Sequence, residues 1–286
     1  MKCAWNAYIN LLPLWMRDDV DRLGRESLQE LRLRIHCFPE LVLQNSSIYL
    51  KRVITENDIQ FIVNAASRYS PWSAYTLQNG YITTAGGHRI GVCGEVVLKE
   101  HKMTGIRSAN MLCLRVARQF QNIANGIETE NRSILIIGQP GSGKTTLLRD
   151  LIRCYSESNI SSIGVVDERG ELFPVSEGRQ CFSPGNHTDV LTGVDKEHGI
   201  EILLRCMNPR VIAVDEITSF NDCKALIEAG WCGVHLFATA HAGSREDLFK
   251  RPVYKPLLET GLFNTLVIMQ ADKSWRTERM LVKCIV

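Results

Sequence analysis

The stretch SILIIGQPGSGKTT, residues 133–146, decides the fold of this chain of 286 residues. It opens with an apolar, β-branched run, passes through a turn rich in glycine and ends where a helical pattern begins. Within it, residues 138–145 fit the pattern GxxxxGK[ST] without deviation. Strand, glycine loop and helix in this order are typical of a phosphate-binding loop, because backbone N–H groups and the helix N-terminus both attract anionic oxygens.

Each residue type in this loop has its own task. The glycines let the backbone curl so that consecutive N–H groups point at phosphate oxygens. Lys144 can reach the β- and γ-phosphates of a nucleotide, and the Thr145 hydroxyl can bind Mg²⁺. We therefore expect a nucleotide to be bound by Gly138, Gln139, Pro140, Gly141, Ser142, Gly143, Lys144, Thr145 and Thr146.

A phosphate loop needs a carboxylate on a neighbouring strand to organise the magnesium ion. VIAVDE, residues 211–216, supplies four apolar residues followed by two acids at the strand end. We expect Asp215 to hold Mg²⁺ through water and Glu216 to polarise the attacking water.

Glu168 and His241 also follow apolar runs. Because the carboxyl ends of parallel strands meet at one edge of a sheet, we expect Glu168, His241, Asp215 and Glu216 to converge on the γ-phosphate. A plainer interpretation stays open for the first two: Glu168 in a salt bridge with Arg169, and His241 as a cap of the next helix.

Apolar runs alternate with helical patterns in the second half of the chain. The expected strands are 134–137, 163–166, 211–214 and 234–238, and the expected helices include 144–154, 196–207 and 221–229. This alternation predicts an α/β fold, a P-loop NTPase domain of the RecA-like/AAA-type with a mainly parallel central sheet. Strand-like runs on both sides of residues 271–274 predict a C-terminal hairpin.

The first half of the chain mixes helix and strand patterns. Thr55, followed three positions later by Asp58, predicts a capped helix start, and Pro71 is expected to end that helix. YITTAGGHRIGVCGEVV, residues 81–97, predicts a hairpin whose turn uses Gly86-Gly87. The first half is therefore expected to form a small α+β domain.

A polar stretch at residues 121–130 predicts the domain boundary, with an N-terminal domain at 1–125 and a P-loop ATPase domain at 126–286. Residues 1–127 carry 15 basic and 10 acidic side chains, whereas the remaining residues carry 18 basic and 21 acidic ones. This asymmetry is either a chance property of the surface or the mark of a subunit or membrane-surface contact. The net charge of only +2 argues against a general nucleic-acid binder.

The cysteines and the apolar runs indicate the compartment. Ten cysteines are scattered singly without a CxxC pair, so neither a zinc site nor a redox motif is expected. No export signal opens the chain, and its apolar runs fall far short of the ~18 residues that a membrane-spanning helix needs. We expect a cytoplasmic protein with reduced, mostly buried cysteines.

Taken together, the motifs resemble the stage III sporulation protein AA family of endospore-forming bacteria, which is similar to the secretion ATPases of type II and type IV systems. The resemblance rests on GQPGSGKTTLLRDLIR, VVDERGEL, TDVL, LLRCMNPRVIAVDE and ATAHA, and extends upstream to LQELRLRI, YITTAGGHRIGVCGE and TGIRSAN. It covers nearly the whole chain, and the order of the segments makes it specific.

The resemblance implies roles for individual residues. Arg205 matches the arginine that precedes the Walker B strand, and His187 stands where the family pattern has an arginine, so a phosphate contact there does not carry over. The acidic box, Walker B and the histidine box fall on Asp167-Glu168, Asp215-Glu216 and His241. The glutamate of the acidic box is associated with water activation and the histidine with the γ-phosphate.

The resemblance also implies cofactors and partners. These are ATP and Mg²⁺, a homo-hexameric ring, and membrane proteins of a sporulation channel complex, with the chain peripheral at the mother-cell side of the forespore membrane. The ATPase would energise or assemble a channel between mother cell and forespore. ATP rather than GTP follows from the resemblance, and the chain lacks an Asn/Thr-Lys-x-Asp motif of the GTPase type.

Arginines of the N-terminal domain approach the nucleotide in related ring ATPases, sometimes from a neighbouring subunit. We favour Arg107 for such a role, although an ordinary salt bridge remains the plainer interpretation for each candidate. The candidates are Arg32, Arg34, Arg89, Arg107, Arg115 and Arg118.

Two other functions stay open at this stage. A nucleic-acid-translocating P-loop ATPase could use the basic first half as a track, but no aromatic-basic stacking motif accompanies that charge. A non-hydrolysing, nucleotide-controlled assembly platform would use the same loop without turnover. Whether Glu168 or Glu216 activates water, the oligomeric state, the membrane partner and the transported molecule also stay open.

Overall fold

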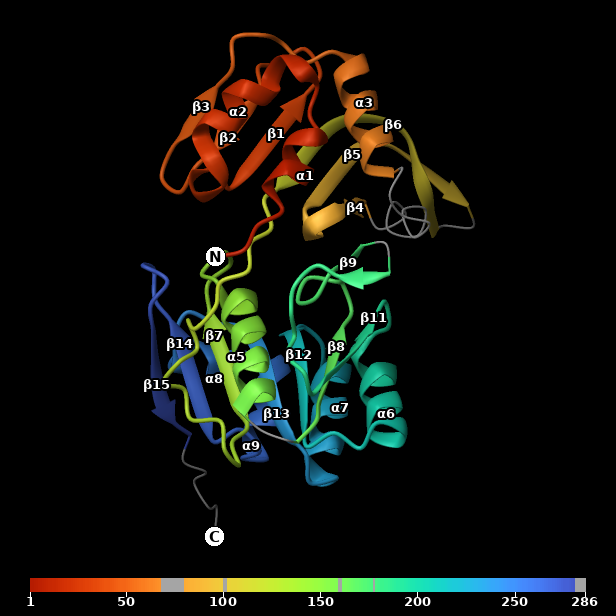
Figure 1. Cartoon of the computed structure of the whole chain (residues 1–286). Helices are drawn as coiled ribbons and strands as arrows, with labels where there is room; N and C mark the ends of the chain where they lie inside the picture. The colour runs from red at the N-terminus through yellow and green to blue at the C-terminus, as the bar shows by residue number, and fades with distance from the viewer. Residues whose placement is uncertain (68–79, 100–101, 159–160, 177, 281–286) are drawn as a thin grey trace. The chain divides into compact units, whose positions relative to one another are not determined.

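The computed structural model describes residues 1–67, 80–99, 102–158, 161–176 and 178–280. The chain divides into two compact units (Figure 1). The first unit comprises Met1–Gln119 and Pro174–Phe182, and the second comprises Phe120–Phe173 and Ser183–Val286. The predicted helix stop at Pro71 lies outside the described residues.

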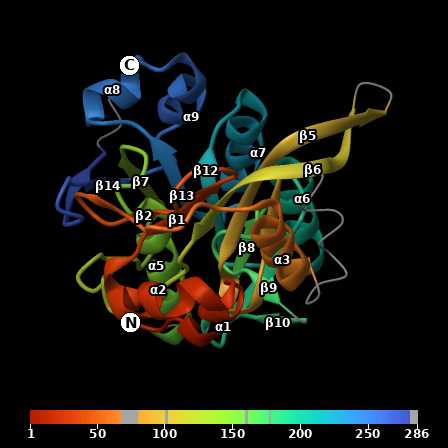
Figure 2. The same cartoon turned by 90° about the horizontal axis from the view of Figure 1, so that it is seen from above.

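The first unit is built on an antiparallel sheet in the order β3-β2-β1-β6-β5-β4. Its strands are β1 (Glu30–Arg34), β2 (Glu40–Val42), β3 (Ser47–Tyr49), β4 (Tyr81–Thr83), β5 (Arg89–Lys99) and β6 (Lys102–Arg115). In Figure 2, β5 and β6 form a long two-stranded ribbon. Side chains alternate between the faces, so Leu31 and Leu33 enter the core while Arg32 stays outside.

Three helices cover the apolar face of this sheet: α1 (Trp5–Asn10), α2 (Leu14–Ser27) and α3 (Glu56–Ser67). The predicted start of α3 is confirmed, because Asp58 Oδ2 accepts hydrogen bonds from the Thr55 backbone N–H and hydroxyl at 2.9 and 2.7 Å. The predicted hairpin is also confirmed. β4 and β5 pair across a turn in which Gly86 and Gly87 have φ of 78° and 79°.

The second unit contains a sheet in the order β11-β8-β12-β13-β7-β14-β15. Its strands are β7 (Ile134–Gly138), β8 (Ile163–Asp167), β11 (Thr188–Thr192), β12 (Val211–Ile217), β13 (His235–His241), β14 (Thr265–Met269) and β15 (Trp275–Arg279). All neighbours are parallel except β15, which pairs antiparallel with β14. The mainly parallel sheet and the C-terminal hairpin are therefore both confirmed.

Helices cover both faces of this sheet (Figure 1). On one face lies α5 (Lys144–Ser158), whose Tyr155 packs edge-on against Phe237 of β13. On the other, one apolar cluster joins the strands to α6 (Lys196–Cys206), α7 (Phe220–Trp231), α8 (Arg245–Lys250) and α9 (Lys255–Glu259). Strands buried on both faces explain the continuous apolar runs in the sequence, and the predicted α/β class holds.

Each of the two units is built from two separate stretches of the chain. The polar stretch at residues 121–130 packs within the second unit, where Ala124 is buried and its N–H donates to Asp150 Oδ2 at 2.9 Å. The small hairpin of β9 (Val175–Ser176) and β10 (Arg179–Gln180) groups with the first unit instead.

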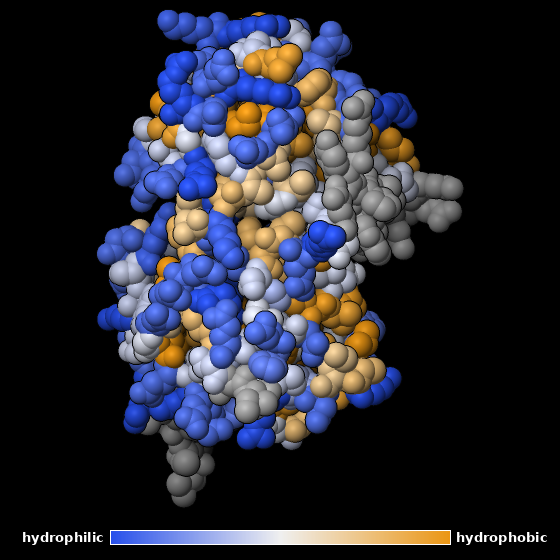
Figure 3. Space-filling view, in the orientation of Figure 1, coloured by the Kyte–Doolittle hydropathy of each residue, from blue (hydrophilic) through white to orange (hydrophobic). Residues whose placement is uncertain are grey.

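The expectation that the cysteines are mostly buried is wrong. Of the cysteines within the described residues, Cys223 is buried, whereas Cys37, Cys93, Cys206 and Cys232 are exposed, and none forms a disulfide. Exposed apolar side chains are scattered among hydrophilic ones on the face shown in Figure 3. Within the described ranges, no helix combines the length and the apolar character needed to cross a bilayer.

Candidate active site

The glycine loop between β7 and α5 has a backbone that other residues would not adopt. Gly141 and Gly143 have φ of 76° and 100°, in the region that favours glycine. At Gly138 the restriction is space: a Cβ there would lie 2.5 Å from Ser142 Oγ and 2.8 Å from Met269 Cβ. The Ser142 hydroxyl is buried and, within the described residues, has no hydrogen-bond partner. A curled backbone with an unsatisfied polar atom fits the role of a phosphate cradle.

Lys144 is the buried cation of the loop. Its ammonium donates to the carbonyl oxygens of Gly138 and Gln139 at 3.0 and 3.1 Å and lies 3.1 Å from Nδ1 of His241. Burial lowers the pKa of Lys144, while the nearby carboxylates Asp215 and Glu216 act in the opposite direction.

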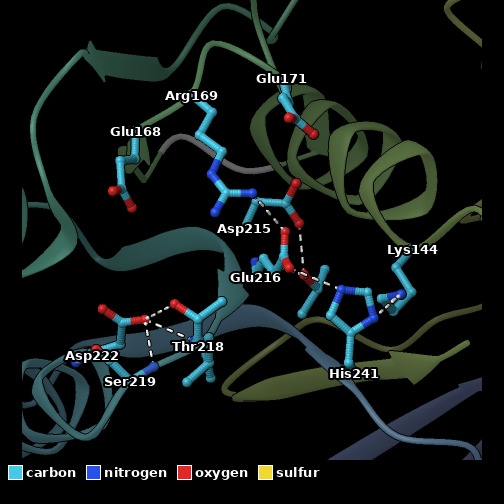
Figure 4. A network of polar contacts seen from close by, with 12 residues as sticks. Lys144, Glu168, Arg169, Glu171, Asp215, Glu216, Thr218, Ser219, Asp222 and His241 are labelled. Atoms are coloured by element: carbon cyan, nitrogen blue, oxygen red, sulfur yellow. Dashed lines mark hydrogen bonds and ion pairs between the residues drawn. The ribbon is translucent and has the colours of Figure 1, made fainter. Parts of the chain in front are cut away.

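His241, at the end of β13, connects this lysine to Glu216 (Figure 4). An ammonium only donates hydrogen bonds, so Nδ1 of the ring must accept from Lys144. The proton of the neutral ring then lies on Nε2, which donates to Glu216 Oε1 at 2.9 Å. The loop lysine, the histidine and the glutamate thus form one continuous chain of hydrogen bonds.

Glu216 sits on an irregular piece of β12. Its φ is +51°, uncommon for a residue with a side chain, and the pairing register with β13 shifts between Val214 and Ile217. The Glu216 N–H donates to the Thr239 hydroxyl at 2.7 Å, and that hydroxyl donates to Asp215 Oδ1 at 2.6 Å. Thr239 therefore holds Asp215 and Glu216 in a fixed arrangement through these two hydrogen bonds.

Asp215 has the surroundings of a magnesium ligand. Burial raises the pKa of its carboxyl, and hydrogen bonds from Thr239 and Thr145 oppose that rise. No group of three or more His, Cys, Asp or Glu within the described ranges is arranged to hold a metal ion. Mg²⁺ commonly takes only one or two protein oxygens and completes its shell with water and phosphate, so Thr145 and Asp215 fit this ion.

Two buried charges hold the segment that follows β8. Asp167 accepts backbone hydrogen bonds from Glu171, Leu172 and Phe173 at 2.8, 3.2 and 2.8 Å, and burial raises the pKa of its carboxyl. Arg149 of α5 donates to the carbonyl oxygens of Leu172 and Glu171 at 2.6 and 2.7 Å. Burial lowers the pKa of this guanidinium to about 10. The segment is held from both its N–H and its C=O groups.

Glu168 is engaged by a residue that the sequence did not suggest. Its Oε2 accepts from the ammonium of Lys196 at 2.6 Å, and the same ammonium lies 3.8 Å from Asp222. Lys196 is buried at the start of α6, and Asp222 belongs to the capping box of α7. The alternative pairing of Glu168 with Arg169 is not observed.

Arg169 pairs with Glu216 instead, with 3.3 Å between Nη1 and Oε2 (Figure 4). The two residues border a small cavity of about 20 Å³, which has room for about one water molecule. The cavity is lined by Asp167, Glu168, Arg169, Glu171, Lys196, Asp215 and Glu216.

The structure brings Lys144, Asp215, Glu216 and His241 into one network, and it places Glu168 on the same cavity but bound to Lys196. Arg205 does not join them. Its side chain is 72% exposed on α6 and pairs with Glu201 of the same helix. A contact from Arg205 to the site of its own subunit is therefore not supported.

Each of the six candidate arginines of the N-terminal half has a partner within the first unit. Arg107 pairs with Glu95 on the β5–β6 ribbon at 3.0 Å and keeps 68% of its side chain exposed. The other partners are Glu30 for Arg32 and Arg115, Glu40 for Arg34, the Tyr81 ring for Arg89, and the Arg25 and Leu28 carbonyls for Arg118.

Sequence reasoning missed Arg149, Lys196 and Thr239. Arg149 lies one turn beyond Lys144, at a buried position among the leucines of α5, and a charge at such a position is itself a usable signal. Lys196 directly follows the helix cap Asp195, a position that usually faces solvent. Nothing in its local pattern indicates burial.

The fold and this network define a P-loop protein with the fold of the secretion ATPases. The ATPase DotB of Yersinia pseudotuberculosis is similar with a TM-score of 0.59 and 16% identity, over 93% of this chain and 77% of that one. The pilus retraction motor PilT, solved with bound ADP, is similar with a TM-score of 0.59 and 15% identity, over 88% and 76% of the two chains. At such identities the likeness shows the fold alone.

The sequence comparisons are more specific. The family described as "Sporulation stage III, protein AA" matches residues 9–281, and the chain belongs to this family. It is 35% identical to the stage III sporulation protein AA of Bacillus subtilis (strain 168), over 94% of this chain and 92% of that protein. It is also 27% identical to the uncharacterized protein ycf45 of Cyanidium caldarium, over 60% of this chain and 54% of that protein.

Proposed function

We propose that this chain is a Mg²⁺-dependent ATPase of the secretion-ATPase type that energises or assembles a channel between mother cell and forespore during endospore formation. The observation that carries the catalytic part is the chain of contacts from Lys144 through His241 to Glu216. It joins the phosphate loop to a carboxylate at the end of a neighbouring strand. A nucleotide-binding site that did no chemistry would not need this connection.

Glu216 is the residue that we assign to activating water. One of its oxygens accepts from His241, the other pairs with Arg169, and the residue lines the water-sized cavity. Within the described residues, Glu168 has no hydrogen bond to His241 or to the loop lysine, and its carboxylate bonds the buried ammonium of Lys196. We assign Glu168 the task of holding α6 and the α7 cap near the site.

The remaining residues bind and orient the nucleotide. Lys144 would exchange the loop carbonyls for phosphate oxygens, and the N–H groups of residues 141–146 would point at the same phosphates. Thr145 and Asp215 would hold Mg²⁺, which when bound neutralises charge on the phosphates. Thr239 keeps Asp215 and Glu216 in a fixed relation.

Hydrolysis is tested by phosphate release from Mg-ATP by the purified chain. We expect Glu216→Gln to keep nucleotide binding and to lower turnover by about 10²–10⁴, the usual effect of losing a general base. Lys144→Ala should weaken binding and turnover together. A matched control is Glu259→Gln, because Glu259 is a largely exposed glutamate paired with Lys255 on α9. If Glu168→Gln abolishes turnover while Glu216→Gln does not, the assignment of the base is reversed.

A wild-type chain that binds ATP without releasing phosphate would instead act as a nucleotide-controlled assembly platform. A chain that binds single-stranded nucleic acid with a steep dependence on salt would favour a translocating ATPase. The same purified protein answers both questions, by nucleotide binding in the first case and by a salt titration of oligonucleotide binding in the second.

We further propose that the working form is a homo-hexameric ring in the cytoplasm, docked on membrane proteins of the channel complex. Arg107 and Arg205 both extend into solvent in the single chain, which is where a residue that contacts a neighbouring subunit would lie. Mass measurement in solution, with and without a non-hydrolysable ATP analogue and Mg²⁺, tests the ring. A strict monomer at high concentration in both conditions would contradict self-assembly without a membrane partner.

The sporulation role is tested in Bacillus subtilis, by replacing its stage III sporulation protein AA with this chain and counting heat-resistant spores. We expect the wild-type chain to restore spores, and Lys144→Ala or Glu216→Gln chains at equal abundance to fail. Restoration by both variants would show that the role in the cell does not need ATP turnover.

A further inference from the structure

Arg169 occupies an unusual place in the candidate site. The small cavity is lined by five acidic residues and two cations, and Arg169 is one of these two cations. The other cation, Lys196, is 5% exposed and lies between Glu168 and Asp222. The Arg169 side chain is 54% exposed and ends at Glu216. Of the two cations that line the cavity, Arg169 is therefore the one accessible to an anion from solvent.

The backbone that carries Arg169 is firmly held. Gly170 has φ of +63°, and its N–H donates to the Asp167 carbonyl at 3.2 Å, which closes a tight turn around Glu168 and Arg169. Just beyond, the Asp167 carboxylate accepts from three backbone N–H groups, and Arg149 binds two carbonyls. The turn cannot move far, so any rearrangement of Arg169 occurs in its side chain.

The contact of Arg169 with Glu216 completes the engagement of that carboxylate. Oε1 accepts from His241 at 2.9 Å, and Oε2 pairs with Arg169 at 3.3 Å. A carboxylate that is to take a proton from water must offer an oxygen to that water. While Arg169 holds Oε2, both oxygens of Glu216 have a partner within the protein.

The terminal phosphate of a nucleoside triphosphate is a stronger partner for a guanidinium than a single carboxylate. It carries more negative charge and offers three oxygens, to which the forked guanidinium can bond in a bidentate way. Arg169 is linked to the loop lysine by three contacts, through Glu216 and His241. A phosphate bound by Lys144 thus lies within the same network.

We propose that Arg169 lets the site distinguish a nucleoside triphosphate from a diphosphate, by exchanging Glu216 for the terminal phosphate and so releasing the carboxylate toward water. Arg169 is then a positioning residue for Glu216 as well as a phosphate contact. The proposal rests on the proposed function, since it concerns the same nucleotide site. After hydrolysis and loss of phosphate, the guanidinium returns to Glu216.

The test is equilibrium binding of Mg-ADP and of a non-hydrolysable ATP analogue with Mg²⁺, measured by calorimetry on the full chain. In Arg169→Ala, affinity for the ATP analogue should fall about tenfold to hundredfold, the range for losing a hydrogen-bonded charge, while ADP affinity stays within about twofold. Arg169→Lys, which keeps the charge without the fork, should lose less. The matched control is Arg276→Ala, because Arg276 is an exposed arginine that pairs with Glu278 on β15.

The variant Glu216→Gln shows whether Arg169 gives up Glu216 when it binds the terminal phosphate, or contacts the phosphate without releasing Glu216. Because the amide is a weaker partner for Arg169, this variant should bind the ATP analogue more tightly than the wild type and ADP equally well. Equal losses for both nucleotides in Arg169→Ala would show a structural role and overturn the proposal, and unchanged binding of both would do the same. If Glu216→Gln binds the ATP analogue no more tightly than the wild type does, the proposed exchange of Glu216 for the terminal phosphate is wrong.

These measurements do not depend on turnover. A wild-type chain that binds both nucleotides but releases no phosphate contradicts the proposed ATPase while the Arg169 test still gives its answer. A chain that binds neither nucleotide contradicts both proposals.

Discussion

The two sheets of this protein differ in where their charged side chains lie. In the first unit, β1 alternates between buried leucines and a solvated row in which Glu30 pairs with Arg32 and Arg115. In the second unit, β7 and β8 are buried along their whole length, and charges gather where strands end or inside the helical layers. Asp167, Lys144 and Lys196 are each nine-tenths or more buried there.

This difference shows which charges are worth testing. An ion pair on a solvated sheet face contributes little, because water screens it and competes for both partners. A buried charge is costly to desolvate, so it persists only where partners compensate it or where function requires it. Substitutions of the buried charges are therefore expected to have the larger effect on stability.

Removing one partner of a buried pair should produce the largest effect. Asp150 accepts from Arg153 at 2.9 and 2.7 Å and from the Ala124 N–H, and both charged side chains are at most 5% exposed. Asp150→Ala leaves the guanidinium with weaker partners and should cost about 3–5 kcal/mol, lowering the Tm of the second unit by roughly 10 °C in calorimetry.

Glu30→Ala in the first unit is the control for that variant. It also removes an acid with two arginine partners, but these arginines are largely exposed to water, so the loss should be no more than about 1 kcal/mol. Equal losses from the two substitutions would mean that burial does not separate the two sheets in the way we describe.

A glycine substitution should have the next largest effect. At Gly138 a Cβ would meet Ser142 and Met269 at less than 3.0 Å, so Gly138→Ala should cost about 1–3 kcal/mol and weaken nucleotide binding. Gly105, on the β5–β6 ribbon, has nothing within 4 Å of a new Cβ and no positive φ. Gly105→Ala should therefore change stability by less than about 0.5 kcal/mol in urea unfolding. A larger loss at Gly105 than at Gly138 would contradict this ranking.

The two units should also respond to pH with opposite signs at one histidine each. His88, fully buried in the first unit, accepts from the Ala117 N–H at Nδ1, and burial lowers the pKa of its ring. The unfolded chain then binds a proton more readily, so the stabilising contribution of neutral His88 is present above pH 6.5 and lost as pH falls toward the lowered pKa. His198, exposed on α6, has a raised pKa because it bonds Asp195.

The contribution of His198 has the reverse dependence: it is present below pH 6.5 and lost as pH rises through the raised pKa. Titration of the ring protons by NMR measures both residues in one sample. His88 should titrate below 6.5 or not at all, and His198 above 6.5. A His88 that titrates above its ordinary value would show that it is not buried as a neutral ring.

The smallest effect should come from Arg107→Glu. It places two acids side by side on the exposed ribbon, where the lost pair with Glu95 is worth at most about 1 kcal/mol. Tm should hardly change in the isolated chain. If the proposed ring uses this arginine, ATP turnover by the assembled form should fall although stability does not. Unchanged turnover by a demonstrated hexamer would contradict a role for Arg107 between subunits.

Much of the fold was predictable because its patterns are local. The Thr55–Asp58 cap and the turn at Gly86-Gly87 span a few residues, and each forms as predicted. The phosphate loop was recognisable because glycine, lysine and threonine occur there at fixed spacing. The burial of the cysteines was predicted wrongly, because a small apolar side chain carries little information about which face it occupies.

The partners of the charged residues were not predictable in the same way. Glu168 has Arg169 beside it in sequence, yet it bonds Lys196, while Arg169 reaches Glu216, 47 positions away. Arg205 matched a motif but lies on a helix face turned to solvent. In each case the linear sequence offers more than one opposite charge, and burial and geometry in the folded chain choose among them.

Residue order alone is enough to predict that a glycine loop joins a buried strand to a helix, and that acids and a histidine end the neighbouring strands. These are consequences of residue spacing and of the parallel sheet that the apolar runs require. Only the tertiary structure decided that His241 lies between Lys144 and Glu216, that Lys196 holds Glu168, and that Arg169 is the arginine at Glu216. The physical reason is that an ion pair depends on distance and desolvation in the folded chain, neither of which the linear order of residues contains.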